Sequence, residues 1–296
     1  MVIIALVISQ SVTALALSHD GKFLAAGFSD GFIRVYDPAT GACLAAKACH
    51  DDEVMSLDFF GDTLLSSGTG KIGVWGAETL SVARSLPVEQ GIKVYSAFFR
   101  RGGREAVSTD ASHPIRLWDF KKRKLRKELK YTGQDVNLVV GCAAVSPDGA
   151  WLFLGYQGWT CEVWDLEKTE KAHVFEVWSP VKHNSCVFSP DGRTLVFGED
   201  DLVSSYETGT WKPISTFSAG DTVSALGFSP DGKTLFVGTR GGLIQAWRDG
   251  KKLAETETGK GRVNALAVGE LVYAGCERGL AILPIAFGEN SDNPQD

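Results

Sequence analysis

Short apolar runs of strand length alternate with turn signals along almost the whole chain. In each unit an apolar run, a tight turn, a second run and a third run ending on an aromatic residue follow one another, with a period of about forty residues. Such runs, bounded by Gly, Pro, Asp and Ser, indicate β-strands. The third-run position is filled by Tyr36, Trp75, Trp118, Trp164, Tyr206, Trp247 and, in the seventh unit, Pro284. The period predicts seven repeated units of short antiparallel strands.

The turn after the first run of four units supports this assignment. The segments 18–21, 146–149, 189–192 and 229–232 each end in Asp-Gly between two β-rich runs. Asp-Gly favours a hairpin, because Gly tolerates a positive φ and Asp can accept a hydrogen bond from its own backbone. Each unit is therefore predicted to be a meander of neighbouring strands.

These residues resemble the WD-repeat (WD40-type) β-propeller family over nearly the whole chain. Trp118-Asp119 and Trp164-Asp165 match the Trp-Asp dipeptide, Tyr36-Asp37 approximates it, and His50 stands where the family has its Gly-His. The resemblance implies a structural role for His50 within its blade. The family's buried set of His, Ser or Thr, Asp and Trp is expected to be incomplete in every blade, so that packing holds most of them.

The expected fold is all-β: a single seven-bladed propeller over residues 1–288 with four-stranded antiparallel blades, followed by a polar tail at 289–296. The expected blades cover residues 11–47, 52–87, 93–131, 137–177, 181–217, 222–257 and 262–287. The last blade lacks a fourth strand, and the apolar segment 2–8 is expected to supply it and close the ring. A signal peptide is the alternative for this segment, but no basic residue precedes it.

Composition limits the function. The chain of 296 residues is used up by the seven units, and its net charge of −6 argues against general nucleic-acid binding. Six cysteines without metal-binding spacing are expected to be small buried hydrophobes in a reducing compartment. We therefore expect a cytoplasmic protein, with the nucleus as a further location, that is not secreted and is a monomer or part of a larger complex.

Matches to catalytic patterns fail on context. The segment 227–234 satisfies the P-loop pattern and 68–73 the dinucleotide pattern, but strands rather than helices are expected after both. The positions that would line a central active site are Val12, Val54, Val94, Asn137, His183, Val223 and Val263. Valine supplies no acid, base or metal ligand. We expect no enzyme activity, no cofactor, no nucleotide and no metal site.

Two surfaces are candidates for binding. With the strands of a blade named a to d from the centre outward, the a–b and c–d turns share one face, the a–b face, whereas the b–c turns and the crossovers between blades share the other, the b–c face. On the b–c face, loop aromatics and acids could bind a Lys- or Arg-bearing peptide, although the aromatics could instead be anchors over the core. The candidate residues are Tyr156, Trp159, Trp178, His183, Glu199, Asp200 and Asp201.

On the a–b face, the third unit gathers a dense basic patch. Its members are Arg100, Arg101, Arg104, Lys121, Lys122, Arg123 and Lys124. The patch could bind an anionic lipid or a nucleic-acid backbone, or it could be a solvated edge that discourages aggregation. The expected function is a non-catalytic scaffold that binds proteins or peptides. Anion recognition by this patch is the alternative, and a propeller enzyme is a second one.

Overall fold

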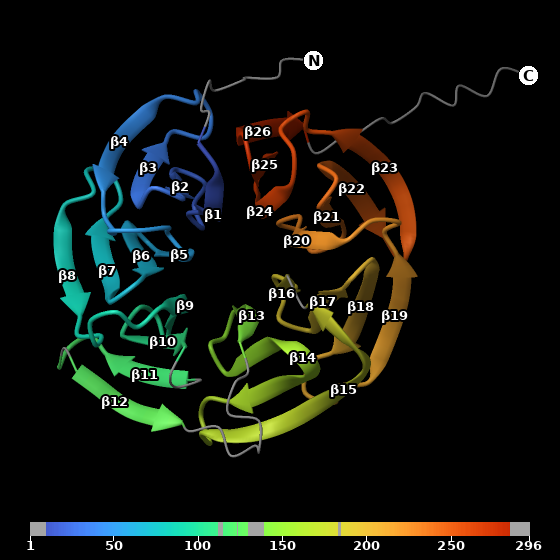
Figure 1. The fold of residues 1–296 in the computed structure, drawn as a ribbon, viewed down its shortest axis with the longest axis horizontal. Helices are drawn as coiled ribbons and strands as arrows, with labels where there is room; N and C mark the ends of the chain where they lie inside the picture. The colour runs from blue at the N-terminus through green and yellow to red at the C-terminus, as the bar shows by residue number, and fades with distance from the viewer. Residues whose placement is uncertain (1–9, 112–114, 123, 130–138, 183–184, 285–296) are drawn as a thin grey trace, which may run out of the picture.

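The computed structural model describes residues 10–111, 115–122, 124–129, 139–182 and 185–284. These residues form seven antiparallel sheets, arranged as blades around a central axis (Figure 1). All 26 elements in the described part of the chain are strands. The fold is therefore the all-β, seven-bladed propeller that the forty-residue period predicts.

The innermost strand of each blade comes first in sequence and the outermost comes last. Blade one contains β1 (Val12–Leu17), β2 (Leu24–Phe28), β3 (Phe32–Tyr36) and β4 (Cys43–Ala48). Blade two contains β5 (Ser56–Phe60), β6 (Thr63–Gly68), β7 (Lys71–Gly76) and β8 (Val82–Leu86). Blade three contains β9 (Val94–Arg100), β10 (Glu105–Asp110), β11 (Ile115–Asp119) and β12 (Lys124–Leu129). Blade four contains β13 (Val140–Val145), β14 (Trp151–Asp165) and β15 (Glu170–Lys182).

The remaining blades follow the same order. Blade five contains β16 (Cys186–Phe188), β17 (Thr194–Glu199), β18 (Leu202–Glu207) and β19 (Pro213–Ser218). Blade six contains β20 (Val223–Phe228), β21 (Leu235–Thr239), β22 (Leu243–Arg248) and β23 (Lys251–Glu257). Blade seven contains β24 (Val263–Val268), β25 (Leu271–Cys276) and β26 (Gly279–Pro284). The strand predicted at 2–8 to complete this blade lies outside the described residues.

The Asp-Gly turns have the predicted geometry. In the turn between β20 and β21, Gly232 has a φ of +71°, and the Ser229 hydroxyl donates to Asp231 Oδ1 at 2.6 Å. The Thr234 N–H in turn donates to Ser229 Oγ at 3.0 Å, which closes the turn. The segment that matches the P-loop pattern is therefore a hairpin that leads into a strand, without the helix that phosphate binding needs.

Several neighbouring blades are joined by a valine at or just before the start of one strand a, which fits against a glycine of the preceding strand b. A Cβ added to Gly27 would lie 2.5 Å from Val54 Cγ1, and one added to Gly238 would lie 2.5 Å from Val263 Cγ1. Such distances are far below van der Waals contact, so each valine occupies the space that a side chain would need. Val263, which opens β24, and Val54, which lies just before β5, therefore join blades.

The first and last blades meet through the same kind of joint. A Cβ on Gly275 of β25 would lie 2.6 Å from Val12 Cγ1, and the Asn264 side-chain amide donates to the Val12 carbonyl at 2.9 Å. Leu24 and Phe28 of blade one share a core cluster with Leu280 of blade seven. Figure 1 shows these two blades side by side. The described residues thus already bring the two ends of the ring into contact.

The cysteines only partly match the expectation. All six are free thiols, and Cys49, Cys161 and Cys276 are buried, whereas Cys142 and Cys186 are half-buried. Cys43 is exposed, so the prediction of burial is wrong for it. It begins β4, an outermost strand with a largely solvent-facing surface.

Candidate functional site

The b–c side of blade four carries an extended two-stranded ladder. β14 pairs with β13 from Leu152 to Tyr156 and with β15 from Gln157 onward. The pairing of β14 with β15 continues through Gly158 opposite Val181, and a register shift separates this pair from Thr160 opposite Glu176. The backbone of Trp159 therefore lies across from the segment that contains Trp178. Both residues belong to strands rather than to the loops predicted from the sequence, and their side chains lie outside the described structure.

Tyr156 does not belong to this surface. Its side chain is 1% exposed, and its hydroxyl donates to Glu162 Oε2 at 3.2 Å. The Trp164 indole N–H donates to the same oxygen at 2.9 Å, and Lys171 forms an ion pair with the carboxylate. The placement of Tyr156 in a b–c loop is wrong, because Tyr156 belongs to β14 and its ring is buried within the blade.

The acidic candidates of blade five lie at the β17–β18 turn and differ in environment. Asp200 is exposed with a φ of +51°, whereas the Asp201 carboxylate accepts a hydrogen bond from the Ser218 hydroxyl at 2.5 Å. Glu199 is half-buried, and burial, followed by the charge of Asp200, raises its pKa. The turn therefore places Asp200 and Glu199 beside a carboxylate that is already bonded. His183 lies outside the described residues.

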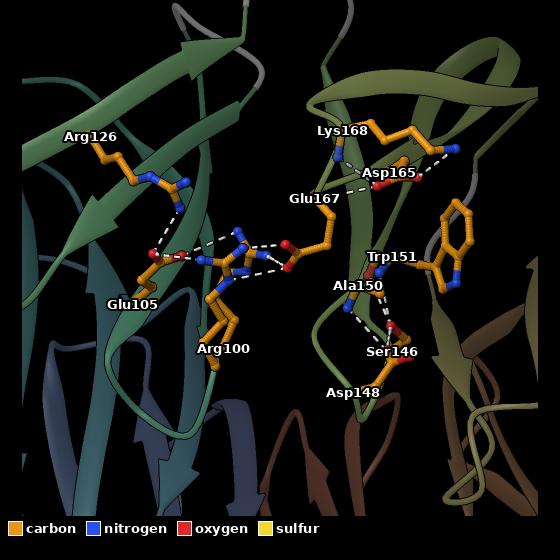
Figure 2. A network of polar contacts seen from close by, with 11 residues as sticks. Arg100, Glu105, Arg126, Ser146, Asp148, Ala150, Trp151, Asp165, Glu167 and Lys168 are labelled. Carbon is orange, nitrogen blue, oxygen red and sulfur yellow. Dashed lines mark hydrogen bonds and ion pairs between the residues drawn. The ribbon is translucent and has the colours of Figure 1, made fainter.

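The basic patch of blade three is partly neutralised by two carboxylates (Figure 2). Arg100 is buried, and its guanidinium lies 2.6 Å from Glu167 Oε1 and 3.3 Å from Glu105 Oε2. Arg101 forms ion pairs with both glutamates, and Arg126 Nη1 lies 2.7 Å from Glu105 Oε1. Burial lowers the pKa of Arg100, and the two carboxylates oppose this effect. The assignment of Arg100 to an exposed anion-binding surface is therefore wrong.

The rest of the patch stays on the surface. Arg104, Lys121, Lys122 and Lys124 are exposed, and Arg123 lies outside the described residues. The Lys122 N–H donates to Asp119 Oδ1 at 2.9 Å, while its ammonium is 3.9 Å from the same carboxylate. These lysines lie around the β11–β12 turn on the a–b face. They form a smaller positive surface than the sequence predicts.

The structural role expected for His50 is confirmed by its contacts. His50 is buried, its Nε2 lies 2.7 Å from Ser66 Oγ, and the Trp75 indole N–H donates to the same oxygen at 2.8 Å. Burial, followed by the charge of Lys71, lowers the pKa of His50 to about 4. The imidazole is therefore neutral near neutral pH, and it links the entry of blade two to Ser66 of β6 and, through this hydroxyl, to Trp75 of β7.

The buried polar partners of the other tryptophans were missed by sequence reasoning. The Trp118 indole N–H donates to Ser108 Oγ at 2.8 Å, and that of Trp247 donates to Gln245 Oε1 at 2.9 Å. Glu162 and Gln245 each stand two residues before their tryptophan, so both side chains share one side of the strand. That spacing was the available signal. These tryptophans therefore have buried hydrogen-bond partners, supplied by Ser108, Glu162 and Gln245, and are not held by packing alone.

Comparisons with known proteins match two parts of this chain to family models, both of which describe WD domains. The model of the anaphase-promoting complex subunit 4 WD40 domain matches residues 7–62, and that of the WD domain, G-beta repeat, matches residues 211–248. A p21-activated protein kinase-interacting protein 1-like from Danio rerio is 25% identical over 85% of this chain and 67% of its own length. A U3 small nucleolar RNA-associated protein 15 homolog from Xenopus tropicalis is 24% identical over 76% of this chain and 43% of its own.

A third relative is a WD repeat-containing protein 70 from Xenopus laevis, which is 26% identical over 78% of this chain and 42% of its own length. The chain therefore spans less than half of two of these relatives. The names of these three relatives denote WD repeats or association with other molecules, and none of them denotes a catalytic activity. Within the described residues, no helix is long and apolar enough to cross a membrane.

Proposed function

The chain belongs to the WD-repeat β-propeller family, and from this premise we propose that it is a non-catalytic scaffold that binds proteins or peptides through the ends of its blades. The joints between blades support this proposal. Val12, Val54, Val223 and Val263, at positions where a propeller enzyme would carry acids, bases or metal ligands, fill space against glycines. Recognition is left to the turns and to the extended ladder of blade four.

We place the main docking surface on the b–c face of blades four and five. The observation that carries this placement is the continued pairing of Gly158 with Val181, which brings the backbone segments of Trp159 and Trp178 together. The exposed Asp200 lies on the same face in the next blade. A surface that offers both aromatic and acidic residues suits a Lys- or Arg-bearing peptide, because such residues combine apolar contact with cation–π attraction and charge pairing.

The test compares wild type with the double variant Trp159→Ala, Trp178→Ala. Ile214→Ala is the matched control, since Ile214 is a 57% exposed apolar side chain on the outer strand of blade five. Proteins captured from cell extract are quantified by mass spectrometry, and the most abundant one is then titrated in pure form. We expect at least a tenfold weaker affinity for the double variant and no change for the control. Equal affinity of a folded double variant would overturn the placement.

The alternative of anion recognition through blade three has weaker support. Two of its predicted members, Arg100 and Arg101, are paired with Glu105 and Glu167, so their charge is largely used within the protein. Exposed lysines of this kind are also the usual protection of an outer strand against aggregation. We extend the scaffold proposal to a nuclear as well as a cytoplasmic location, because one relative is named for a small nucleolar RNA.

A further inference from the structure

A cavity of about 630 Å³ opens on the a–b face, away from the proposed docking surface. It is formed where the first turns of blades one to four converge. Its apolar wall consists mainly of Phe59, Phe60, Phe98 and Phe99 together with Val145 and Pro147. Phe60 is 48% exposed, and its ring also lies against Gly103 of the neighbouring turn. The cavity thus offers aromatic surface that the fold leaves open to solvent.

Asp58 is a carboxylate on the wall of this cavity that has no cationic partner among the described residues. Asp58 lies on β5, and its Oδ2 accepts the Phe99 N–H of β9 at 2.7 Å. Among the described residues it forms no ion pair. The other charged lining groups are engaged: Asp20 pairs with Lys22, Asp148 accepts the Ser146 hydroxyl, and Arg100 and Arg101 pair with glutamates. Asp58 is therefore a carboxylate of the cavity without a cationic partner, and Asp148, which has none among the described residues either, is bonded within its own turn by the Ser146 hydroxyl and the Ala150 N–H.

The surroundings of Asp58 oppose its ionised form. Burial raises the pKa of this carboxyl to about 6, and the hydrogen bond from the Phe99 N–H only partly offsets that effect. Asp58 is half-buried, and a cation brought next to it would relieve the cost of its partly desolvated negative charge. The site is thus complementary to a positive ligand near neutral pH.

We propose that this cavity is a second binding site, which takes a lysine side chain of a partner polypeptide flanked by apolar residues. The ammonium group pairs with Asp58, and the aliphatic stem lies against the phenylalanine rings. Lysine fits better than arginine, because the Phe99 N–H takes up part of the accepting capacity of Oδ2, which weakens a two-point contact with a guanidinium group more than the single contact of an ammonium group. This site lies on the opposite face from the blade-four surface and is independent of it.

The test uses four short fluorescent peptides that carry lysine, acetyl-lysine, arginine or norleucine between two leucines, with binding followed by anisotropy at pH 7.5. Wild type is expected to bind the lysine peptide at least tenfold more tightly than the acetyl-lysine and norleucine peptides, and more tightly than the arginine peptide. Asp58→Asn should abolish this preference. Asp62→Asn is the matched control, because it removes the same charge from the neighbouring turn outside the cavity.

Two further measurements keep the proposal falsifiable if Asp58→Asn is unstable. Phe60→Ala should weaken binding of the lysine peptide, and wild-type affinity should fall as the pH drops below about 6, where Asp58 becomes protonated. The variant Trp159→Ala, Trp178→Ala should bind the lysine peptide normally, which separates this site from the blade-four surface. Equal affinity of wild type for the lysine and acetyl-lysine peptides, or no binding to either, would overturn the proposal.

Discussion

At the scale of single residues, His50 and Asp58 are titratable groups whose pKa values are shifted by burial, so their protonation affects the stability of the fold. His50 must be neutral to sit between Ser66 and the apolar interior, whereas Asp58 resists ionisation in its cavity. The two groups respond to acid in opposite senses. Protonation of His50 opposes the native state, while protonation of Asp58 favours it.

We predict a pH dependence of stability that is specific to His50. Its folded pKa of about 4 lies below the unfolded value of 6.5, so the unfolded state binds more protons between these values and stability falls as pH drops from about 6.5 to about 4. The full effect corresponds to about 3 kcal/mol. Urea unfolding of wild type and His50→Gln across this range should show a steeper loss in wild type.

The matched control for this prediction is His19→Gln, because His19 is an exposed histidine in the first turn of blade one. It should keep the wild-type profile. Asp58 is present in all three proteins, so its opposite contribution cancels from the comparison. Parallel pH profiles for wild type and His50→Gln would show that the buried imidazole has no part in acid sensitivity.

At the scale of strands and turns, a charged cluster joins blades three and four. Glu105 begins β10 and contacts three arginines, while Glu167, in the β14–β15 turn, reaches across to Arg100 and Arg101. The Glu105 side chain is 12% exposed and that of Glu167 is 49% exposed. Screening by solvent makes the second carboxylate the weaker contributor.

The two glutamates should therefore differ in their effect on stability. We expect Glu105→Gln to lower the free energy of unfolding by about 2 kcal/mol or more, because a charge next to buried Arg100 is lost, and Glu167→Gln to lower it by about 1 kcal/mol or less. In an Arg100→Met background the cost of Glu105→Gln should shrink. Chemical denaturation measures all four variants, and equal costs for the two glutamates would contradict this ranking.

Local signals made the strands and turns predictable, and distant contacts limited the prediction of sites. The Asp-Gly turns and the repeated aromatic residue depend on neighbours in sequence, so the period alone predicts seven blades. Arg100 was assigned to the surface because its partner Glu167 lies 67 residues away. The sequence predicts a loop at Tyr156, whereas β14 runs on from Trp151 to Asp165 and changes its pairing partner from β13 to β15 after Tyr156. The Arg100–Glu167 contact and the pairing of β14 with β15 both depend on segments that come together only when the blades form.

At the scale of the whole molecule, the ring depends on equivalent joints between its blades. Val12 against Gly275 connects the first and last blades, and Val263 against Gly238 connects blades six and seven. Both glycines lie on strand b and both valines open strand a. The seam between the ends of the chain is therefore built like an internal one.

We predict that Gly275→Ala lowers the free energy of unfolding by about 1–3 kcal/mol, because its Cβ would overlap Val12. Combining it with Val12→Ala should recover part of the loss, since space is returned to the same joint. Gly238→Ala is the matched control at an internal seam and should cost a similar amount. A neutral Gly275→Ala would mean that the first and last blades are not held together by this joint.

The valine-to-glycine joints also determine which positions can vary. A side chain larger than hydrogen at Gly27, Gly198, Gly238 or Gly275 collides with a valine that belongs to the adjacent blade. A mutational tolerance map would therefore show these glycines as intolerant as the residues of a reaction centre, although they bind nothing. In such a map, intolerance at these four glycines would reflect the packing of one blade against the next. Residues that recognise a ligand would have to be identified at other positions.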